Sequence, residues 1–473
     1  MPMQIHRNIQ LSPTVTSTPH NTYDFIIVGA GPAGLSLAAR LSSSSSHPSV
    51  LLIGAGGPNN DQEYLVLAER FTLFGTQPSF NWGYKTEPCK HLAGQQIDYS
   101  RGKGIGGSTA INFSCWMIGG AEDYDAWAEK VDDDTWSWVN VKERFKKIEH
   151  YHDEVPDQYR ELVNPKPEDH GTSAAKQAGL PLNTDVNPGN PIGMGMGSSC
   201  MHEGLRTTAS SYLPLMGPRF ETILNAPVAK ILFDGKRTKG IRTIDGREYY
   251  ANKDVILSAG ALNSPQLLML SGIGPASELQ KHNIPIVKDP PQVGKNLQDH
   301  SFITTSLLLK EGSNDRMEFE MNEEMKKTAK EGWTKEKSGK LAELYCGAPM
   351  GWFRNDRALE INANLMNHPY DQRVLIEAVK KTMEFLDKPV FREKTIKMIG
   401  VPEGGVEAGD EEIWEHCRNN LFSSWHMSST VRMGKDKDEN TACIDTNFRV
   451  LGVEGLRVVD CSVLPLLPNN QPT

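Results

Sequence analysis

A short apolar run, followed by a glycine-rich turn and a helical pattern, opens the first clear structural unit of the chain. Residues 25–28 (Phe-Ile-Ile-Val) are strand-forming and carry no polar alternation, which is typical of a strand buried on both faces. Between residues 35 and 41 apolar side chains return at helical spacing. The glycines at 29, 31 and 34 lie between the two patterns. The segment therefore predicts a strand–turn–helix unit.

Each of these glycines has its own physical reason in such a turn. Gly29 allows the tight bend, Gly31 lets the backbone approach a pyrophosphate, and Gly34 lets the helix pack against the strand. The free N–H groups of the helix would face the phosphates. This order favours dinucleotide binding over an ordinary glycine-rich turn. An acidic residue for the ribose is expected after the second strand, 49–53, but Gly54 stands there.

The pattern further along the chain predicts more strands and helices. Residues 121–150 are typical of helices packed through aromatic side chains. Residues 219–257 alternate strand runs with Asp-Gly turns and predict a β-meander that ends in a buried strand. A helix is expected to begin near Ser264 and to end at Gly272. Residues 456–460 predict one more buried strand.

A second glycine-rich turn covers residues 101–112 (RGKGIGGSTAIN). Its glycines permit close backbone approach, and the side chains of Ser108, Thr109 and Asn112 offer short polar groups. Such a turn could wrap an extended anionic ligand. The apolar residues at its end indicate that it is anchored in a core rather than free.

Composition and charge narrow the classes of function. Lys and Arg number 50 against 59 Asp and Glu, a net charge of −9, which gives no reason to expect a nucleic-acid partner. The seven cysteines are scattered without a CxxC pair, so neither a metal site nor a disulfide framework is indicated. No apolar run reaches membrane-spanning length, and residues 1–21 are expected to be a flexible lead-in without a signal peptide. A cytoplasmic protein with reduced cysteines is expected.

The glycine-rich segments and the end of the chain together resemble the glucose–methanol–choline family of flavin oxidoreductases, and the style of VGKNLQDH resembles fungal members most. Four blocks carry the resemblance in the family's order. They are GAGPAG at 29–34, GKGIGGSTAIN at 102–112, GALNSPQLLMLSGIG at 260–274, and SSWHMSSTVRMG at 423–434 with RVVDCSVLPLLPNNQP at 457–472.

The resemblance implies an α/β fold with a discontinuous Rossmann-like FAD-binding domain and an α+β substrate domain that contains an antiparallel sheet. The implied FAD-binding segments are 22–150, 206–300 and 421–473, the last with the catalytic histidine. The substrate side would come from 151–205 and 301–420.

The resemblance also implies FAD as the cofactor and a set of residues at it. By motif position these are Gly29, Gly31, Gly34, Gly106, Gly107, Ser108, Thr109, Asn112, Val228, Trp425 and Asp460. The first three would meet the pyrophosphate, Val228 the adenine, and Asp460 the phosphates or the ribityl chain. Ile111 stands where some relatives tether FAD through a histidine. Because isoleucine has no nucleophile, non-covalent FAD is expected.

The implied activity is oxidation of the CH–OH group of a small or medium organic alcohol, such as a fungal secondary-metabolite intermediate. His426 occupies the place of the family's catalytic histidine and would take the hydroxyl proton while the hydride moves to flavin N5. Gln471 occupies the place of the second member of the catalytic pair. A glutamine can orient the alcohol but cannot exchange a proton at neutral pH.

Several departures from the family pattern leave alternatives open. Gly54 replaces the ribose-binding glutamate, Ser429 replaces a glycine, and the family's helix beyond Gln471 has no counterpart. The substrate side looks shortened after residues 173 and 360. A cyclase or dehydratase on the same fold, without a redox step, is therefore a second hypothesis, and a catalytically inactive remnant is a third. The oligomeric state stays open.

Overall fold

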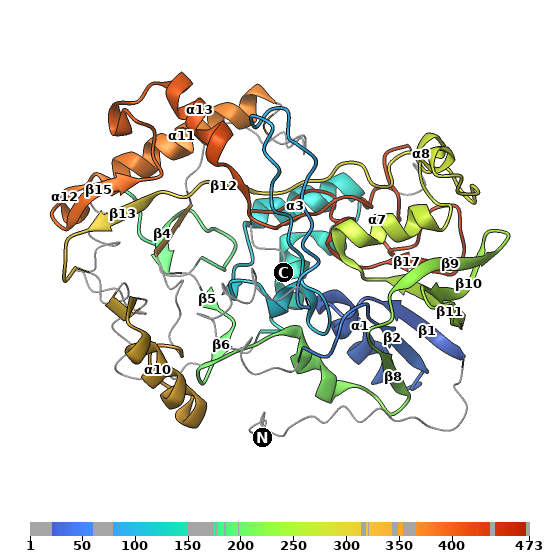
Figure 1. Cartoon of the computed structure of the whole chain (residues 1–473). Coiled ribbons are helices and arrows are strands. Elements are labelled where there is room, and N and C mark those ends of the chain that lie inside the picture. The colour runs from blue at the N-terminus through green and yellow to red at the C-terminus, as the bar shows by residue number, and fades with distance from the viewer. Residues whose placement is uncertain are drawn as a thin grey trace.

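A computed structural model gives the fold of the chain (Figure 1). The residues that it describes are 21–59, 79–149, 175, 177–183, 186–196, 198–313, 318–319, 321–342, 349–352, 366, 368–435 and 440–469. Statements about the fold below concern these residues.

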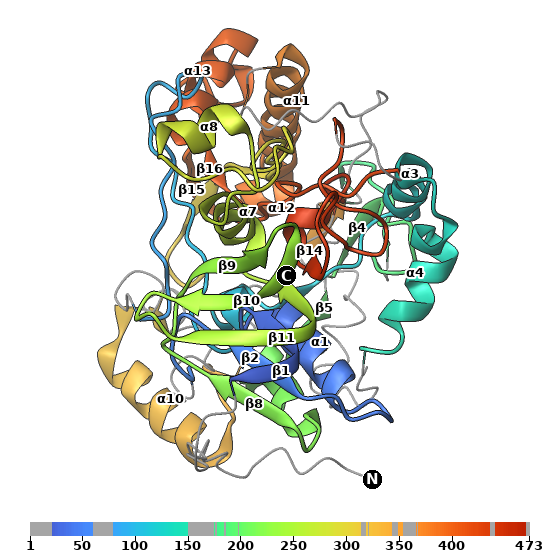
Figure 2. The ribbon, with the colours of Figure 1, turned by 90° about the vertical axis from the view of Figure 1, so that its right-hand side faces the viewer.

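The core of the molecule is a seven-stranded sheet assembled from three distant parts of the chain (Figure 2). Its strands run in the order β8 (Phe220–Ile223), β2 (Val50–Ile53), β1 (Thr22–Val28), β11 (Glu248–Leu257), β10 (Arg237–Thr243) and β9 (Val228–Asp234), and β17 (Leu456–Val458) also pairs with β11. The strands β8, β2, β1, β11 and β17 are mutually parallel, as in a dinucleotide-binding fold.

The expected meander is confirmed for β9, β10 and β11, which pair antiparallel in sequence order. β8 is not part of it, because it pairs with β2 at the opposite edge of the sheet. The expected final strand is confirmed as β17.

Two helices cover opposite faces of the sheet. The helix α1 (Pro32–Ser42) packs Leu35 and Ala38 against Ile27 of β1 and against alternate residues of β2 and β11. The helix α7 (Gly260–Leu270) packs Leu267 and Leu268 against the other face. The unbroken apolar run of β1 follows from this arrangement, since both of its faces are covered.

The start of α7 differs from the expectation, because the helix begins at Gly260 and contains Pro265. A proline has no N–H to donate to the carbonyl four residues earlier, here that of Ala261. The hydroxyl of Thr430 donates to this carbonyl instead, at 2.6 Å. A partner from a distant segment therefore allows the helix to start before its proline.

Outside the central sheet, the described part of the chain consists largely of helices and short antiparallel ribbons, many of them on the left of Figure 1. The helices expected over residues 121–150 are confirmed as α3 (Ala121–Val131) and α4 (Trp138–Phe145), α10 (Glu323–Glu336) is a further helix, and α11 (Pro369–Leu386) packs on α13 (Asp410–Asn420). The expected antiparallel pairing is present as separate two-stranded ribbons rather than one broad sheet in the part that the structure describes. They are β12 (Ser301–Phe302) with β16 (Phe422–Ser423), β13 (Ser306–Leu309) with β15 (Thr395–Ile399), β14 (Pro349–Trp352) with β4 (Gly193–Met196), β3 (Cys115–Trp116) with β5 (Ser198–Ser199), and β6 (Met201–His202) with β7 (Leu205–Arg206).

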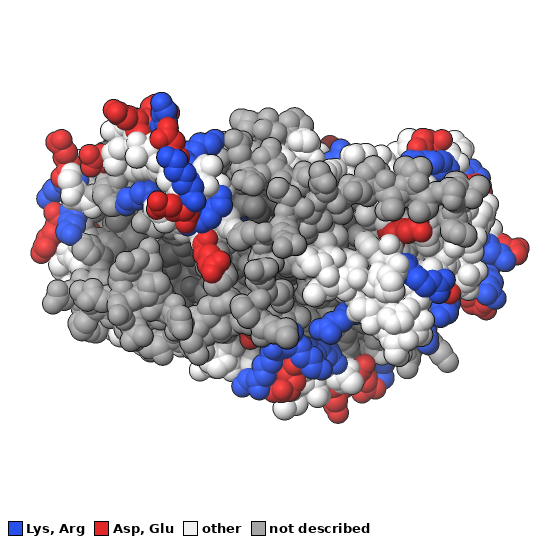
Figure 3. Space-filling model, turned by 90° about the horizontal axis from the view of Figure 1, so that it is seen from below, with Lys and Arg blue, Asp and Glu red and all other residues white. Residues whose placement is uncertain are grey.

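The surface carries charges of both signs close together. In the view from below, basic and acidic side chains share the same groups along the rim (Figure 3). Among the helices described, none combines the length and the apolar character that a membrane crossing requires.

The packing of α1 on β1 predicts that alanine destabilises the protein at Gly34 but not at Gly31. A Cβ on Gly34 would lie 2.0 Å from the carbonyl oxygen of Gly29, whereas a Cβ on Gly31 would meet only the Cα of Gly107, at 3.9 Å. We expect Gly34→Ala to lower the free energy of unfolding by about 1–3 kcal/mol because the backbone must shift. Gly31→Ala is the matched control and should unfold like the wild type. Denaturant unfolding of the ligand-free proteins measures both, and equal stability of the two variants would contradict this packing.

Candidate functional site

The first glycine-rich turn has the geometry that a phosphate-binding turn requires. Gly29 has φ +115°, and a Cβ there would lie 2.2 Å from the carbonyl oxygen of Ser258, so no larger residue fits. Gly34 is blocked by the backbone of Gly29, while the Cβ direction of Gly31 is open. Gly29 and Gly34 are thus required for packing, whereas Gly31 faces free space at the N-terminus of α1, where helix N–H groups favour anions.

The second glycine-rich turn lies directly against the first. The N–H of Gly106 donates to the carbonyl of Ala30 at 2.9 Å, and a Cβ on Gly107 would lie 2.7 Å from the Cα of Gly31. Gly107 begins a short 3-10 helix that ends at Ala110. The two turns therefore lie in direct contact, and their binding of one extended ligand stays a prediction.

A buried arginine holds the end of the second turn. Arg206 donates from Nη2 to the carbonyls of Thr109 and Asn112 and to Asn112 Oδ1, at 2.7–2.9 Å. It donates from Nη1 to the carbonyl of Ala110 and from Nε to the hydroxyl of Ser114. Because these acceptors are fixed by one guanidinium, the turn keeps its shape without a ligand.

Asp460 connects the end of β17 to the start of α7. Its Oδ2 accepts from the N–H of Gly260 at 2.8 Å and from the hydroxyl of Ser264 at 2.5 Å, and its Oδ1 accepts from the N–H of Ser462. The carboxylate thus lies at the N-terminus of α7, where the helix dipole favours it. Val228 lies half-buried at the start of β9, against the main core.

His426 lies on a bulge between two short antiparallel pairings. On one side the N–H of Ser424 donates to the carbonyl of His300 at 2.9 Å, next to the ribbon of β12 and β16. On the other side Ser428 and Gln298 exchange both backbone hydrogen bonds. Residues 425–427 therefore stand opposite the single residue Asp299. A bulge of this kind turns side chains away from the direction that regular pairing would give them.

Side chains satisfy the backbone of this bulge. Asp299 Oδ1 accepts from the N–H of His426 at 2.8 Å, and Oδ2 accepts from the hydroxyl of Ser423. The oxygen of Ser423 in turn accepts from the N–H of Trp425 at 2.7 Å. Arg101 donates to the carbonyl of Trp425 and contacts Ser108 from Nε and Nη2. The second glycine-rich turn is thereby tied to the segment that carries His426.

The imidazoles of His426 and His300 contact each other through Nδ1, at 2.8 Å and with rings at 89°. Burial, with smaller contributions from His300 and the positive charge of Arg101, lowers the pKa of His426 to about 3. Burial lowers the pKa of His300 to about 4. Burial also raises the pKa of Asp299 to about 6, against hydrogen bonds from Ser423 and from the N–H of His426. Both histidines are therefore neutral at physiological pH.

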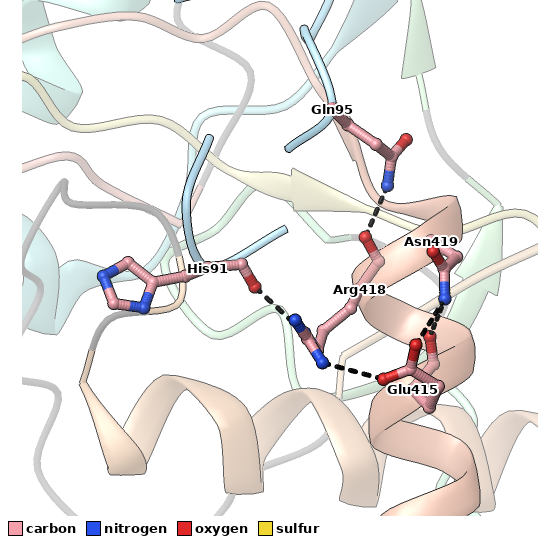
Figure 4. A network of polar contacts seen from close by, with 5 residues as sticks. All are labelled: His91, Gln95, Glu415, Arg418 and Asn419. Atoms are coloured by element: carbon pink, nitrogen blue, oxygen red, sulfur yellow. Dashed lines mark hydrogen bonds and ion pairs between the residues drawn. The ribbon is translucent and has the colours of Figure 1, made fainter. Parts of the chain in front are cut away.

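The helix that precedes this segment is fixed at its C-terminal end (Figure 4). Arg418 of α13 donates to the carbonyl of His91 at 3.4 Å and pairs with Glu415 at 2.8 Å. The side-chain amide of Gln95 donates to the carbonyl of Arg418. The side-chain amide of Asn419 donates to the backbone carbonyl and to the carboxylate of Glu415. These contacts join α13 to the loop before Arg101, and Arg101 itself donates to the carbonyl of Trp425, so this stretch of chain contacts both α13 and the residue before His426.

The residues predicted to contact the cofactor differ in their surroundings. The predicted glycines lie together, but the hydroxyl of Ser108 is held by Arg101, and that of Thr109 donates to the carbonyl of Gly106 at 2.6 Å. The indole of Trp425 donates to Asp98 and stacks on Phe113. Their contacts with a cofactor stay predictions.

Two of the departures from the family pattern, Gly54 and Ser429, lie within the described residues. The Cβ direction of Gly54 is crowded by Ala30 and Leu224, at 3.2 and 3.3 Å. Ser429 has φ +69°, which explains a glycine in relatives. Gln471, residues 1–20 and the shortened segment after 360 lie outside the described residues.

The sequence analysis did not identify four of the polar residues that build the site. They are Arg101, Arg206, Asp299 and His300. His300 is not among the predicted site residues, although the segment VGKNLQDH ends in the pair Asp299-His300. The signal was an acidic residue next to a histidine directly before a strand, on a segment rich in amides. Arg206 gave no local signal, because its acceptors lie more than 90 residues earlier.

Family models for GMC oxidoreductases match most of the chain. The N-terminal model matches residues 23–302 and the C-terminal model residues 354–473. Among curated proteins, the chain is 32% identical to the oxygen-dependent choline dehydrogenase of Pseudomonas entomophila over 94% of this chain and 90% of that protein. It is 31% identical to the protein of the same name from Yersinia pseudotuberculosis, over 94% and 89%.

Solved structures show the same fold at lower identity. A variant of formate oxidase from Aspergillus oryzae has a TM-score of 0.82 at 20% identity, over 96% of both chains. A fungal aryl-alcohol oxidase has a TM-score of 0.78 at 20% identity, over 95% of this chain and 96% of the other. With both family models matched in order and curated relatives above 30% identity across nearly the full length, the chain belongs to the GMC oxidoreductase family, whose FAD-binding fold it has.

Proposed function

We propose that this protein oxidises the CH–OH group of a small or medium organic alcohol, with non-covalent FAD as cofactor and His426 as the base. The observation that carries the proposal is the position of His426 on a bulge that is tied through Arg101 to the second glycine-rich turn. The relatives named choline dehydrogenase and aryl-alcohol oxidase support an alcohol as substrate. The resemblance to fungal members supports an intermediate of secondary metabolism as one candidate.

The residues present fit FAD. Of the first three glycines, Gly31 alone has a Cβ direction that meets nothing closer than 3.9 Å, at a helix N-terminus that suits a pyrophosphate. Gly107 of the second turn lies against Gly31, and a side chain at Gly107 would collide with the backbone there. Ile111 is buried and has no nucleophile for a covalent link. When bound, FAD supplies the acceptor for the hydride.

The role of His426 is to accept the hydroxyl proton of the alcohol. A base must be unprotonated before the reaction, and burial together with Arg101 keeps the pKa of His426 well below physiological pH. The half-buried imidazole is also shielded from bulk water, which strengthens its interaction with a bound hydroxyl. Gln471 would orient that hydroxyl, as its motif position suggests.

The first test removes the base. In His426→Ala we expect the rate constant of FAD reduction by a reactive alcohol to fall about 10²–10⁴-fold, since general-base catalysis contributes that much. FAD content should be unchanged. Anaerobic stopped-flow absorbance with a panel that includes choline and aromatic alcohols measures the rate, and His282→Ala, on an exposed helix end, is the control.

The outcomes of this test separate the alternatives. Bound FAD that no alcohol reduces, with a product lighter by one water, would replace the proposal by the cyclase or dehydratase. A His426→Ala enzyme as fast as the wild type would rule out the assigned base.

The second test concerns the cofactor. We expect one FAD per chain, released in full by acid precipitation because the attachment is non-covalent. Gly31→Ala should raise the dissociation constant for FAD at least about tenfold by placing a methyl group where the backbone meets the pyrophosphate. Titration of the ligand-free proteins with FAD measures the dissociation constant, and an unchanged unfolding midpoint of Gly31→Ala is the control. A wild type that binds no FAD would favour the inactive remnant.

The third test checks that His426 is neutral, without a substrate. A histidine whose folded pKa is lowered takes up a proton on unfolding, so its contribution to stability is present above pH 6.5 and is lost as pH falls toward 3. Asp299 acts in the opposite direction between about pH 4 and 6, because its pKa is raised. Between pH 6.5 and 4 the wild type should therefore lose stability more steeply than His426→Ala, by about 1 kcal/mol per pH unit. Urea unfolding of ligand-free proteins across this range measures the difference, and parallel curves would contradict a neutral His426.

A further inference from the structure

The contact between His300 and His426 constrains where their protons are. Both rings use Nδ1, and the 2.8 Å separation has room for one proton between the two nitrogens. Either His426 donates and His300 accepts, or the reverse. A neutral imidazole carries one proton, so the donor's Nε2 has the free lone pair and the acceptor's Nε2 carries a proton. The direction of this hydrogen bond therefore decides which nitrogen of His426 can act as a base.

The surroundings identify His300 as the acceptor that His426 needs. The carboxylate of Asp299 accepts from the backbone N–H of His426 and from the hydroxyl of Ser423, whereas the ring of His426 contacts the ring of His300. Arg101 has only donors, and they are directed to Ser108, to the sulfur of Met427 and to the carbonyl of Trp425.

The position of His300 is fixed by the backbone on both sides of its contact. Its carbonyl accepts from the N–H of Ser424, and the next residue, Ser301, pairs with Ser423. The two rings therefore meet at one angle, 89°, on rigidly paired segments. A mobile surface histidine could not impose a tautomer in this way.

We propose that His300 is a positioning residue: its Nδ1 accepts the Nδ1 proton of His426, so that His426 presents an unprotonated Nε2 to the substrate. The proposal rests on the proposed function. In the reaction the O–H bond of the alcohol breaks, its proton forms a bond to Nε2 of His426, and the carbinol hydride leaves to FAD, so that the alcohol becomes a carbonyl compound. The imidazolium formed on His426 keeps donating from Nδ1 to His300, which stabilises the new charge.

The kinetic test compares two substitutions of His300 that differ in one acceptor atom. In His300→Asn the amide oxygen can take the place of Nδ1 as acceptor, and we expect the rate constant of FAD reduction to stay within about fivefold of the wild type. In His300→Leu the acceptor is lost, and we expect a decrease of about 10²-fold with little change in the substrate dissociation constant. FAD content and unfolding midpoint are measured for both.

Two kinetic results would overturn the proposal. One is a His300→Leu enzyme that is as fast as the wild type. The other is an equal loss in both variants, because a merely structural role of His300 does not distinguish an acceptor atom from a methyl group.

A second measurement does not depend on activity. Nitrogen-15 chemical shifts of histidine-labelled FAD-loaded protein report the tautomer of each imidazole, and His426→Gln assigns the signal. We expect His426 to carry its proton on Nδ1 in the wild type and in His300→Asn, and a mixture of tautomers in His300→Leu. A wild-type His426 protonated on Nε2 would overturn the proposal. If no alcohol reduces FAD while His426 shows the Nδ1 tautomer, the proposed function fails and the role of His300 in setting the tautomer stands.

Discussion

The pairing of β11 with both β1 and β17 is the constraint on which the rest of the structure depends. It brings together strands that begin at residues 22, 248 and 456. Each of the three strands ends at the same edge of the sheet, as parallel strands must. The turn after β1, the start of α7 after β11 and Asp460 after β17 consequently meet at that edge, where Asp460 bonds to Gly260. A ligand site built from three distant segments follows from one set of ladder hydrogen bonds.

The site itself depends on a different balance, between an irregular backbone and the side chains that satisfy it. A bulge leaves N–H and C=O groups without ladder partners, and leaving them unpaired inside the protein is costly. Asp299, Ser423 and Arg101 supply the missing partners. One of these residues also affects protonation, because the positive charge of Arg101 adds to burial, the main cause, in disfavouring a proton on His426. The arginine that positions the histidine therefore also helps to keep it neutral.

Local patterns predicted the elements whose causes are local. The strand–turn–helix unit with Gly29, Gly31 and Gly34, the meander and the final strand follow from spacing and turn chemistry, and the four motifs indicated the family and His426. The start of α7 was placed wrongly because Pro265 suggested a beginning, and its freed carbonyl is satisfied by Thr430, far along the chain. The ribbon of β12 and β16, Arg101 as a clamp and His300 as a partner of His426 depend on contacts between residues more than 100 apart, which periodicity does not reveal.

The bulge that carries His426 also says something about the order in which the molecule is made. Its partners Asp299 and Arg101 precede it by 127 and 324 residues, so they are synthesised long before the histidine. Closing such long loops is entropically expensive until other contacts already hold the ends near each other. The contact of α13 with Gln95 and the hydrogen bonds of Ser429 and Val431 to the segment after β17 bring these ends together, so they favour formation of the bulge. A chain that ended before residue 421 would keep both glycine-rich turns and would lack His426.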